Sequence, residues 1–226
     1  MRNIFCLKKL VCTISILLVF NSCHNNNTKK GTQKNKYVTF WEWFETKEEE
    51  YFVYEQNQTK LFDSLDSKLS AVNPNITFIF TEAQDGKRHF IVSADSAKEA
   101  FLDVRELARA APKLKKWEVI AFRPRLNPLV TIAFEGLIVE PDDIMVKYNY
   151  NKETKLVDLI LYIKYYKKSD KRFLGASLAM LDNALGESDA ETKIGTVELK
   201  KFIQHTDNKN LIPLKELPKI VDSYFE

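Results

Sequence analysis

The sequence is poor in the residues that build metal centres and phosphate-binding loops. Its 226 residues include three cysteines, three histidines and six glycines. Zinc sites take several closely spaced cysteine or histidine ligands, whereas His24, His89 and His205 lie far apart in the chain. Loops that cradle phosphates rely on clustered glycines, and the sequence has no such cluster. We therefore predict no metal site and no cofactor.

What the sequence has in quantity is apolar and aromatic side chains. Apolar residues make up 45% of the chain and aromatic residues 12%, which excludes disorder as the dominant state. A chain of this length can form one or two domains. Because no repeat or low-complexity stretch interrupts residues 37–226, we expect them to form a single domain.

The first 22 residues have the composition of a secretory signal peptide. Arg2, Lys8 and Lys9 precede an apolar run of 11 residues, Leu10–Phe20. A membrane-spanning helix needs about 20 apolar residues, whereas a run of about 7–15 is typical of a signal peptide. Residues 1–22 are therefore predicted to direct export.

The residues around Cys23 resemble a bacterial lipobox. Ser22 places a small residue directly before the cysteine, although Phe20 and Asn21 depart from the usual pattern. Relaxed versions of this kind resemble those of the Bacteroidota. The resemblance implies that Cys23 carries acyl chains such as palmitate and becomes the first residue of a mature lipoprotein, since two or three acyl chains hold a protein stably on a membrane. An ordinary signal peptide with a coincidental cysteine and an uncleaved anchor are the alternatives.

Residues 23–36 separate the predicted lipid from the predicted domain. They contain no large apolar residue, so we expect a flexible tether. They also lack the acidic cluster that resembles a surface-export signal in Bacteroidota lipoproteins, and this favours an envelope protein that faces the periplasm. The formal charge of +3 is lost with residues 1–22, because 31 basic and 31 acidic residues remain.

Hydrophobic periodicity divides residues 37–226 into helices and strands. Helices are expected at 39–52, 60–72, 96–110, 173–185 and 214–225, and strands at 76–81, 88–94, 117–123, 144–150, 156–166 and 194–203. Residues 129–139 are expected to form one bent strand or two short strands. Asp85-Gly86 indicates a hairpin turn, and Ser96 with Glu99 has the spacing of a helix capping box. Because helices gather at both ends with consecutive strands between them, we predict an α+β fold with a largely antiparallel sheet of about six or seven strands and flanking helices.

One stretch of the chain is similar to a serine hydrolase motif. Gly175-Ala176-Ser177-Leu178-Ala179 resembles the Gly-x-Ser-x-Gly elbow, with alanine for the final glycine, and Asp182, Asp189 and His205 follow it. The elbow requires a strained turn between a strand and a helix, whereas this serine lies within the apolar stripe of a predicted helix. We therefore expect Ser177 to pack against a neighbouring element. No catalytic residue is assigned, and a non-enzymatic role is favoured.

Clusters of charge provide the candidate binding residues. The glutamates between positions 42 and 50 are expected to form a solvated helix face, and Asp142-Asp143 a turn. A basic run, Lys164–Arg172, includes two tyrosines. Arg123-Pro124-Arg125 closes a predicted strand, and arginine forks suit carboxylate or phosphate recognition. We therefore predict Arg123 and Arg125 as contacts for an acidic ligand, with solubilising charge at strand ends as the alternative.

Short stretches spread over the predicted domain form a signature. They are FWEWF (40–44), VNP (72–74), DGKRHF (85–90), AAP (110–112), Trp117 with IAFR (120–123), LGE (185–187), ETKIG (191–195) and IPLKEL (212–217). This signature resembles a family of uncharacterised bacterial proteins of unknown function. The resemblance covers nearly the whole domain and implies no activity, since that family has no assigned function or catalytic residues.

These observations predict a lipid-anchored envelope protein whose domain is a binding or interaction module. Its partner would be an unknown protein or a small acidic ligand, and an exposed aromatic patch containing Trp41 or Tyr51 would favour the protein. A hydrolase with a site assembled from dispersed residues is one alternative, and an immunity- or inhibitor-like protein, by analogy of fold class alone, is another. Nucleic acid is not expected as a partner, because the domain has no net basic charge and is predicted to be exported.

Overall fold

The computed structural model describes residues 35–203 and 210–225. The predicted signal peptide, Cys23 and almost all of the predicted tether lie outside these ranges. Lys34–Glu226 form one compact unit. Within the described ranges, no helix combines the length and the apolar character that a membrane crossing requires.

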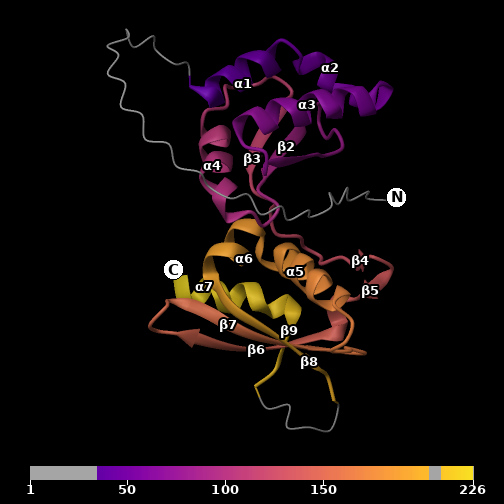
Figure 1. Ribbon diagram of the computed structural model, residues 1–226, viewed down its shortest axis with the longest axis vertical. Coiled ribbons are helices and arrows are strands. Elements are labelled where there is room, and N and C mark those ends of the chain that lie inside the picture. The colour runs from indigo at the N-terminus through magenta and orange to yellow at the C-terminus, as the bar shows by residue number, and fades with distance from the viewer. Residues whose placement is uncertain (1–34, 204–209, 226) are drawn as a thin grey trace, which may run out of the picture. The chain divides into compact units, whose positions relative to one another are not determined.

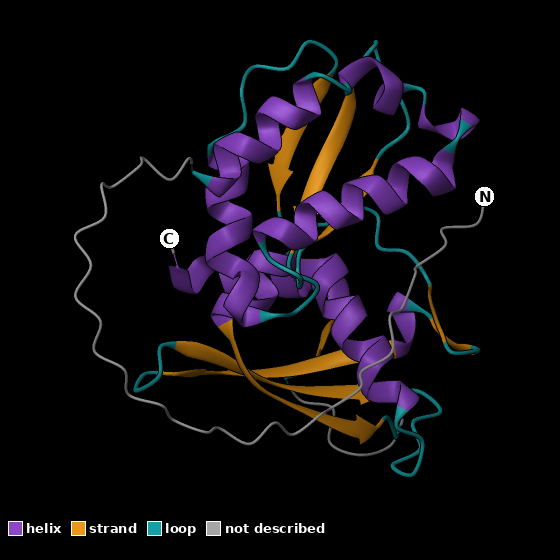
Figure 2. Ribbon diagram, turned by 45° about the horizontal axis from the view of Figure 1, so that its top comes forward, coloured by secondary structure: helices purple, strands orange, loops and turns teal. Residues whose placement is uncertain are grey.

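The first half of the described chain folds as helices on a three-stranded sheet. Its helices are α1 (Lys36–Glu45), α2 (Glu48–Phe52), α3 (Gln58–Val72) and α4 (Phe101–Arg109). Its strands are β1 (Thr77–Phe80), β2 (Arg88–Ser93) and β3 (Trp117–Ala121), in that order across the sheet. β1 is antiparallel to β2, while β3 is parallel to β2 because α4 lies in the connection between them. Figure 2 shows α1 and α3 in front of this sheet.

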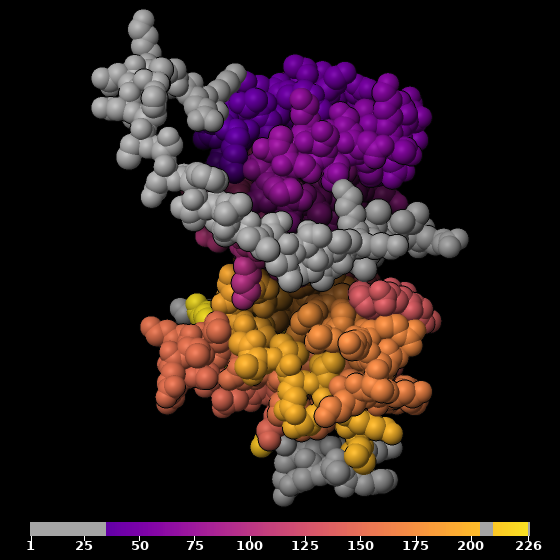
Figure 3. Space-filling view, in the orientation of Figure 1, coloured from indigo at the N-terminus to yellow at the C-terminus, as the bar shows by residue number. Residues whose placement is uncertain are grey.

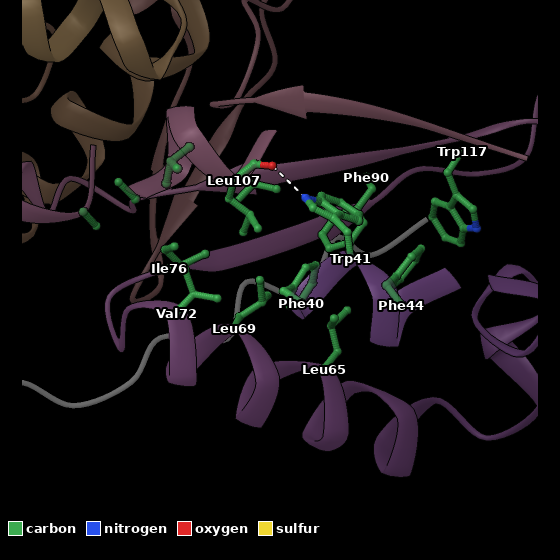
Figure 4. Packing of buried hydrophobic residues seen from close by; sticks show 14 of the residues in the cluster. Phe40, Trp41, Phe44, Leu65, Leu69, Val72, Ile76, Phe90, Leu107 and Trp117 are labelled. Atoms are coloured by element: carbon green, nitrogen blue, oxygen red, sulfur yellow. Dashed lines mark hydrogen bonds between the residues drawn. The ribbon is translucent and has the colours of Figure 1, made fainter. Parts of the chain in front are cut away.

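Aromatic side chains fill the first hydrophobic core. Phe40, Trp41 and Phe44 of α1 pack against Phe90 of β2, and Leu65 and Leu69 of α3 complete the layer (Figure 4). The buried Trp41 indole donates to the Leu107 carbonyl at 2.7 Å. Trp41 and Tyr51 are only 2% and 1% exposed, so an exposed aromatic patch containing them does not exist.

The second half is a four-stranded sheet with helices on one face (Figure 1). The sheet has the order β8-β7-β6-β9, formed by β6 (Ile144–Asn151), β7 (Leu156–Ile163), β8 (Ile194–Lys201) and β9 (Ile212–Pro213). The helices are α5 (Arg172–Leu185), α6 (Glu187–Lys193) and α7 (Leu217–Phe225). A separate hairpin of β4 (Ile132–Phe134) and β5 (Leu137–Val139) packs on α5. Alternation along β7 buries Val157, Leu159, Leu161 and Ile163 in this second core.

The predicted α+β class is confirmed, with one correction to the sheet. Among the described residues, four of the six strand pairings are antiparallel, but the strands form three sheets, and the largest has four strands rather than six or seven. The Asp85-Gly86 turn is confirmed, because both residues have positive φ and Gln84 and Lys87 exchange backbone hydrogen bonds.

Several helices differ from the sequence prediction. The capping box at Ser96 is wrong: Ser96 has a φ of 69°, and α4 begins only at Phe101 after a 3₁₀ turn over Lys98–Ala100. The Glu99 carboxylate instead accepts a hydrogen bond from Asn75 at 3.1 Å. The helix expected at 39–52 divides into α1 and α2, and α6 was not predicted.

Candidate functional site

Arg123 and Arg125 follow β3 and lie beside the end of α5 and the start of α6. Two backbone hydrogen bonds fix this segment to α5 and α6. The Arg123 carbonyl accepts from the Glu187 N–H at 2.9 Å, and the Leu126 N–H donates to the Asn183 carbonyl at 2.8 Å. Gly186, between α5 and α6, has a φ of 77°, and a Cβ there would lie 3.3 Å from the Arg123 carbonyl oxygen. Glycine therefore permits this close approach.

The Arg123 guanidinium binds three side chains, two at the end of β2 and one in α5. Its Nη1 donates to Ser93 Oγ at 2.9 Å and to Asp95 Oδ1 at 3.0 Å, both just at the end of β2. Its Nη2 donates to Asp182 Oδ2 of α5 at 2.7 Å. Burial lowers the pKa of Arg123, but the carboxylates of Glu187, Asp182 and Asp95 outweigh it, and the net effect is a raised pKa. Arg123 is therefore a fixed, fully charged link between β2 and α5.

The Arg125 guanidinium makes a second set of bonds. Its Nη1 and Nη2 donate to the two oxygens of Asp222 in α7, each at 2.7 Å, and Nη2 also binds Asp189 of α6. Its Nε donates to the Leu185 carbonyl at 2.8 Å. The hydrogen bond to Asp222 is the main cause of the raised pKa of Arg125. A two-oxygen arginine–carboxylate contact fixes geometry as well as charge.

Glu187 is the buried centre of this arrangement. Its side chain is 1% exposed, and its two oxygens accept from the Ala94 N–H at 2.8 Å and the Arg123 N–H at 3.0 Å. Asp182 is also largely buried, and burial raises its pKa although Arg123 opposes this. We call Arg123, Arg125, Asp182, Glu187 and Asp222 the arginine junction. No residue motif in the sequence identifies Glu187 as its centre.

The arginine junction connects the two halves of the described chain by charge-assisted hydrogen bonds. A shallow hollow of about 240 Å³ lies next to it and is lined by both arginines. Both guanidinium groups are already bound to carboxylates of the same chain, so an acidic ligand would have to displace those carboxylates. Recognition of an acidic ligand by Arg123 and Arg125 therefore stays a prediction, while the bonds themselves act as a structural cross-link.

The other residues singled out in the sequence occupy structural positions. Ser177 lies inside α5, is fully buried and makes no hydrogen bond with a described residue, so the requirement for a strained turn is not met. Pro141–Asp143 form a 3₁₀ turn, as predicted for the two aspartates. Across residues 35–203 and 210–225, no three His, Cys, Asp or Glu side chains are grouped to hold a metal ion.

A strip of exposed apolar side chains along α5 was missed by the sequence analysis. Leu174 and Leu178 lie in the helix predicted at 173–185, whose apolar residues would be expected to be buried, but they are 50% and 45% exposed. Phe173, Ala176, Met180 and Leu181 form the buried face instead. The periodicity of leucines alone could not separate these two faces, because both faces of α5 carry apolar residues.

The segment from Leu126 to Glu135, which includes β4, runs antiparallel alongside α5. Leu126 is bonded to Asn183 near the end of α5, and the Glu135 carbonyl accepts from Arg172 at its start at 3.1 Å. Between them, the Phe134 ring packs on Gly175, where an added Cβ would overlap the ring. Figure 3 shows residues around 130–138 against the α5 region. Leu126 and Val130 of this segment are exposed, as are Leu174 and Leu178 of α5, and we call these four residues the α5 strip.

Comparisons with known proteins give no relative from which a function could be transferred. No family model, no curated protein and no solved structure matches the chain.

Proposed function

We propose that this chain is a lipid-anchored protein of the bacterial envelope whose folded part binds another protein through the α5 strip. The observation that carries the binding role is the exposure of Leu126, Val130, Leu174 and Leu178 along one helix and the segment beside it. A group of exposed apolar side chains on neighbouring segments is typical of an interaction site. Burying a fully exposed leucine side chain contributes about 1.5–3 kcal/mol. The four residues of the strip are 38–50% exposed, so each contributes a fraction of that value to the free energy of binding.

The architecture around the α5 strip supports a binding role. The buried face of α5 packs in the second core, and near the end of the helix Asp182 binds Arg123. The adjacent segment is fixed by hydrogen bonds at Leu126 and Glu135. A rigid surface loses little conformational entropy when it binds a partner.

Site-specific photo-crosslinking in the native envelope tests the binding role. A photoreactive amino acid in place of Leu178 is expected to give a discrete crosslinked product, and Leu174→Glu in the same chain should abolish it. The matched control places the same group at Leu102, a 65% exposed leucine of α4, and should give no such product. Equal crosslinking from both positions, or a product that survives Leu174→Glu, contradicts the proposed surface.

The membrane anchor is supported by the sequence before the described domain. An apolar run of 11 residues ends three residues before Cys23, and the following polar stretch suits a tether. Cys23→Ser should release the protein from membranes and abolish labelling by radioactive palmitate, while Cys12→Ser should change neither. Unchanged membrane association of the Cys23→Ser protein would show that acylation is not its anchor.

A further inference from the structure

A group of lysines lies at one end of the four-stranded sheet. β7 and β8 are parallel, so both strands end at the same edge, with Ile163 opposite Lys201. The Phe202 N–H donates to the Ile163 carbonyl at 3.0 Å, and this bond keeps the residues that follow β7 and β8 next to each other. The loop 164–171 then connects β7 to α5 (Figure 1). This geometry gathers six lysines, which we call the basic end: Lys164, Lys167, Lys168, Lys171, Lys200 and Lys201.

The basic end carries more positive charge than its own carboxylates neutralise. Lys164 pairs with Asp143 at 3.2 Å and Lys200 with Glu198 at 3.1 Å. Asp170 pairs with Arg172 at 2.7 Å, so its charge is neutralised by that residue. The remaining four lysines form no ion pair with another residue that the structure describes. The excess charge is local, because the chain without residues 1–22 has equal numbers of basic and acidic residues.

Two large exposed side chains follow the same two strands, and Lys164 Nζ lies 5.6 Å from the centre of the Tyr165 ring. Tyr165 is 70% exposed and Ile203 is 52% exposed. Tyr165 has a φ of 63°, a conformation that is uncommon for a bulky residue and that accumulates at functional sites. Tyrosine has an apolar ring with a polar tip, which is the combination favoured at the boundary between lipid and water. Lysines together with exposed tyrosine and isoleucine therefore match an anionic, partly apolar surface.

We propose that the basic end docks on anionic phospholipid and fixes the orientation of the domain at the membrane. The proposal rests on the anchoring part of the proposed function. A lipid tether alone allows all orientations of the domain, whereas lysines near an anionic bilayer add attraction within a Debye length of its surface. Acyl chains combined with a basic patch form the two-signal anchor that gives stable attachment. The α5 strip is then left available to a protein partner.

Vesicle sedimentation with the full, unacylated chain tests the docking separately from acylation. The protein is mixed with vesicles of pure phosphatidylcholine or with vesicles in which half of the lipid is phosphatidylglycerol. Residues 1–22 include Arg2, Lys8 and Lys9 and add the same attraction to anionic vesicles in every variant, so the comparison of test and control variants cancels it. The test variant is Lys167→Gln, Lys168→Gln and Lys171→Gln together. The matched control is Lys60→Gln, Lys87→Gln and Lys113→Gln, three exposed lysines of the first half.

The wild-type chain should partition at least tenfold more strongly into the anionic vesicles than into the neutral ones, and added salt should remove the difference. The test variant should lose most of this preference, while the control should keep it. Tyr165→Ser should weaken binding to anionic vesicles at high salt, where the apolar contribution dominates. Equal losses in test and control variants, or a wild type with no anionic preference, would overturn the proposal and leave the basic end to another anionic partner. Acyl labelling of Cys23 fails or succeeds independently of these results.

Discussion

Gly175 and Ser177, which resemble part of a serine hydrolase motif in the sequence, have packing roles in the structure. The glycine accommodates the Phe134 ring of β4 on the surface of α5, and the serine is buried on the other side of the same helix. The Ser177 hydroxyl makes no hydrogen bond with a described residue. A buried hydroxyl without a partner costs free energy that folding does not recover.

We predict that Ser177→Ala stabilises the protein by about 1 kcal/mol, because it removes an unpaired buried hydroxyl and improves helix propensity. Thermal unfolding should show a midpoint higher by roughly 2–4 °C. The control is Ser223→Ala in α7, where the hydroxyl is exposed and donates to the Ile220 carbonyl at 2.7 Å, and little change is expected there. A loss of stability in Ser177→Ala would mean that the hydroxyl has a partner in solution.

The two arginines mark the limit of prediction at the residue scale. Their charge and position at the end of a strand could be read from the sequence, and the structure places both there. Their partners could not be read: Arg123 binds a carboxylate 59 positions away and Arg125 one 97 positions away. Only the pairing of distant elements brings Asp182 and Asp222 to them.

At the scale of elements, a polar clasp joins α1 to α3 and α4. Asp103 of α4 accepts from the Tyr37 hydroxyl at 2.7 Å and from Asn73 at 2.7 Å, and it pairs with Lys36. Burial opposes ionisation of Asp103, but the bonds from Asn73, Lys36 and Tyr37 together hold its pKa below 3.8. The bond to Asp103, followed by burial, raises the pKa of Tyr37 to about 12.

The clasp predicts loss of stability at both extremes of pH. The neutral Tyr37 phenol stabilises the fold below its ordinary pKa of 10.0, and this contribution disappears as pH rises through about 12. The ionised Asp103 contributes above its ordinary pKa of 3.8, and its contribution disappears as pH falls through the lowered value. Tyr37→Phe should therefore cost about 1–2 kcal/mol at neutral pH, with the difference from wild type vanishing above pH 12 in urea unfolding. For Asp103→Asn, the difference from wild type in the free energy of unfolding should disappear only in acid. A difference for Tyr37→Phe that persists unchanged above pH 12 contradicts the clasp.

Elements were easier to predict than their pairing. Apolar residues that repeat every 2 positions in a strand or every 3.6 in a helix located most of the elements, because each element has one buried face. The number of strands per sheet depends on contacts that no local period records. β9 has only two residues and joins β6 across the chain, and β3 is parallel to β2 through α4. A helix as short and polar as α6 also has no apolar stripe to reveal it.

At the scale of the whole molecule, the buried apolar residues that the structure describes form two clusters rather than one. The first contains residues 40–122 and the second residues 132–221. The arginine junction links them, since Arg123 and Ala94 on one side bind Asp182 and Glu187 on the other. Removing one partner from a buried ion pair leaves an uncompensated charge, which costs about 3–5 kcal/mol. The junction should therefore determine whether the two clusters unfold together.

Arg123→Met provides a test, because all three tryptophans, Trp41, Trp43 and Trp117, belong to the first cluster or pack against it. Tryptophan fluorescence thus reports the first cluster alone, whereas far-ultraviolet circular dichroism reports both. In the wild type the two urea midpoints should coincide. In Arg123→Met they should separate, since Asp182 and Glu187 lose their cation. The control Arg109→Met removes an exposed arginine paired with Glu106 and should cost less than about 1 kcal/mol without separating the signals. Coincident midpoints in Arg123→Met would show that apolar contact, rather than the arginine junction, couples the two clusters.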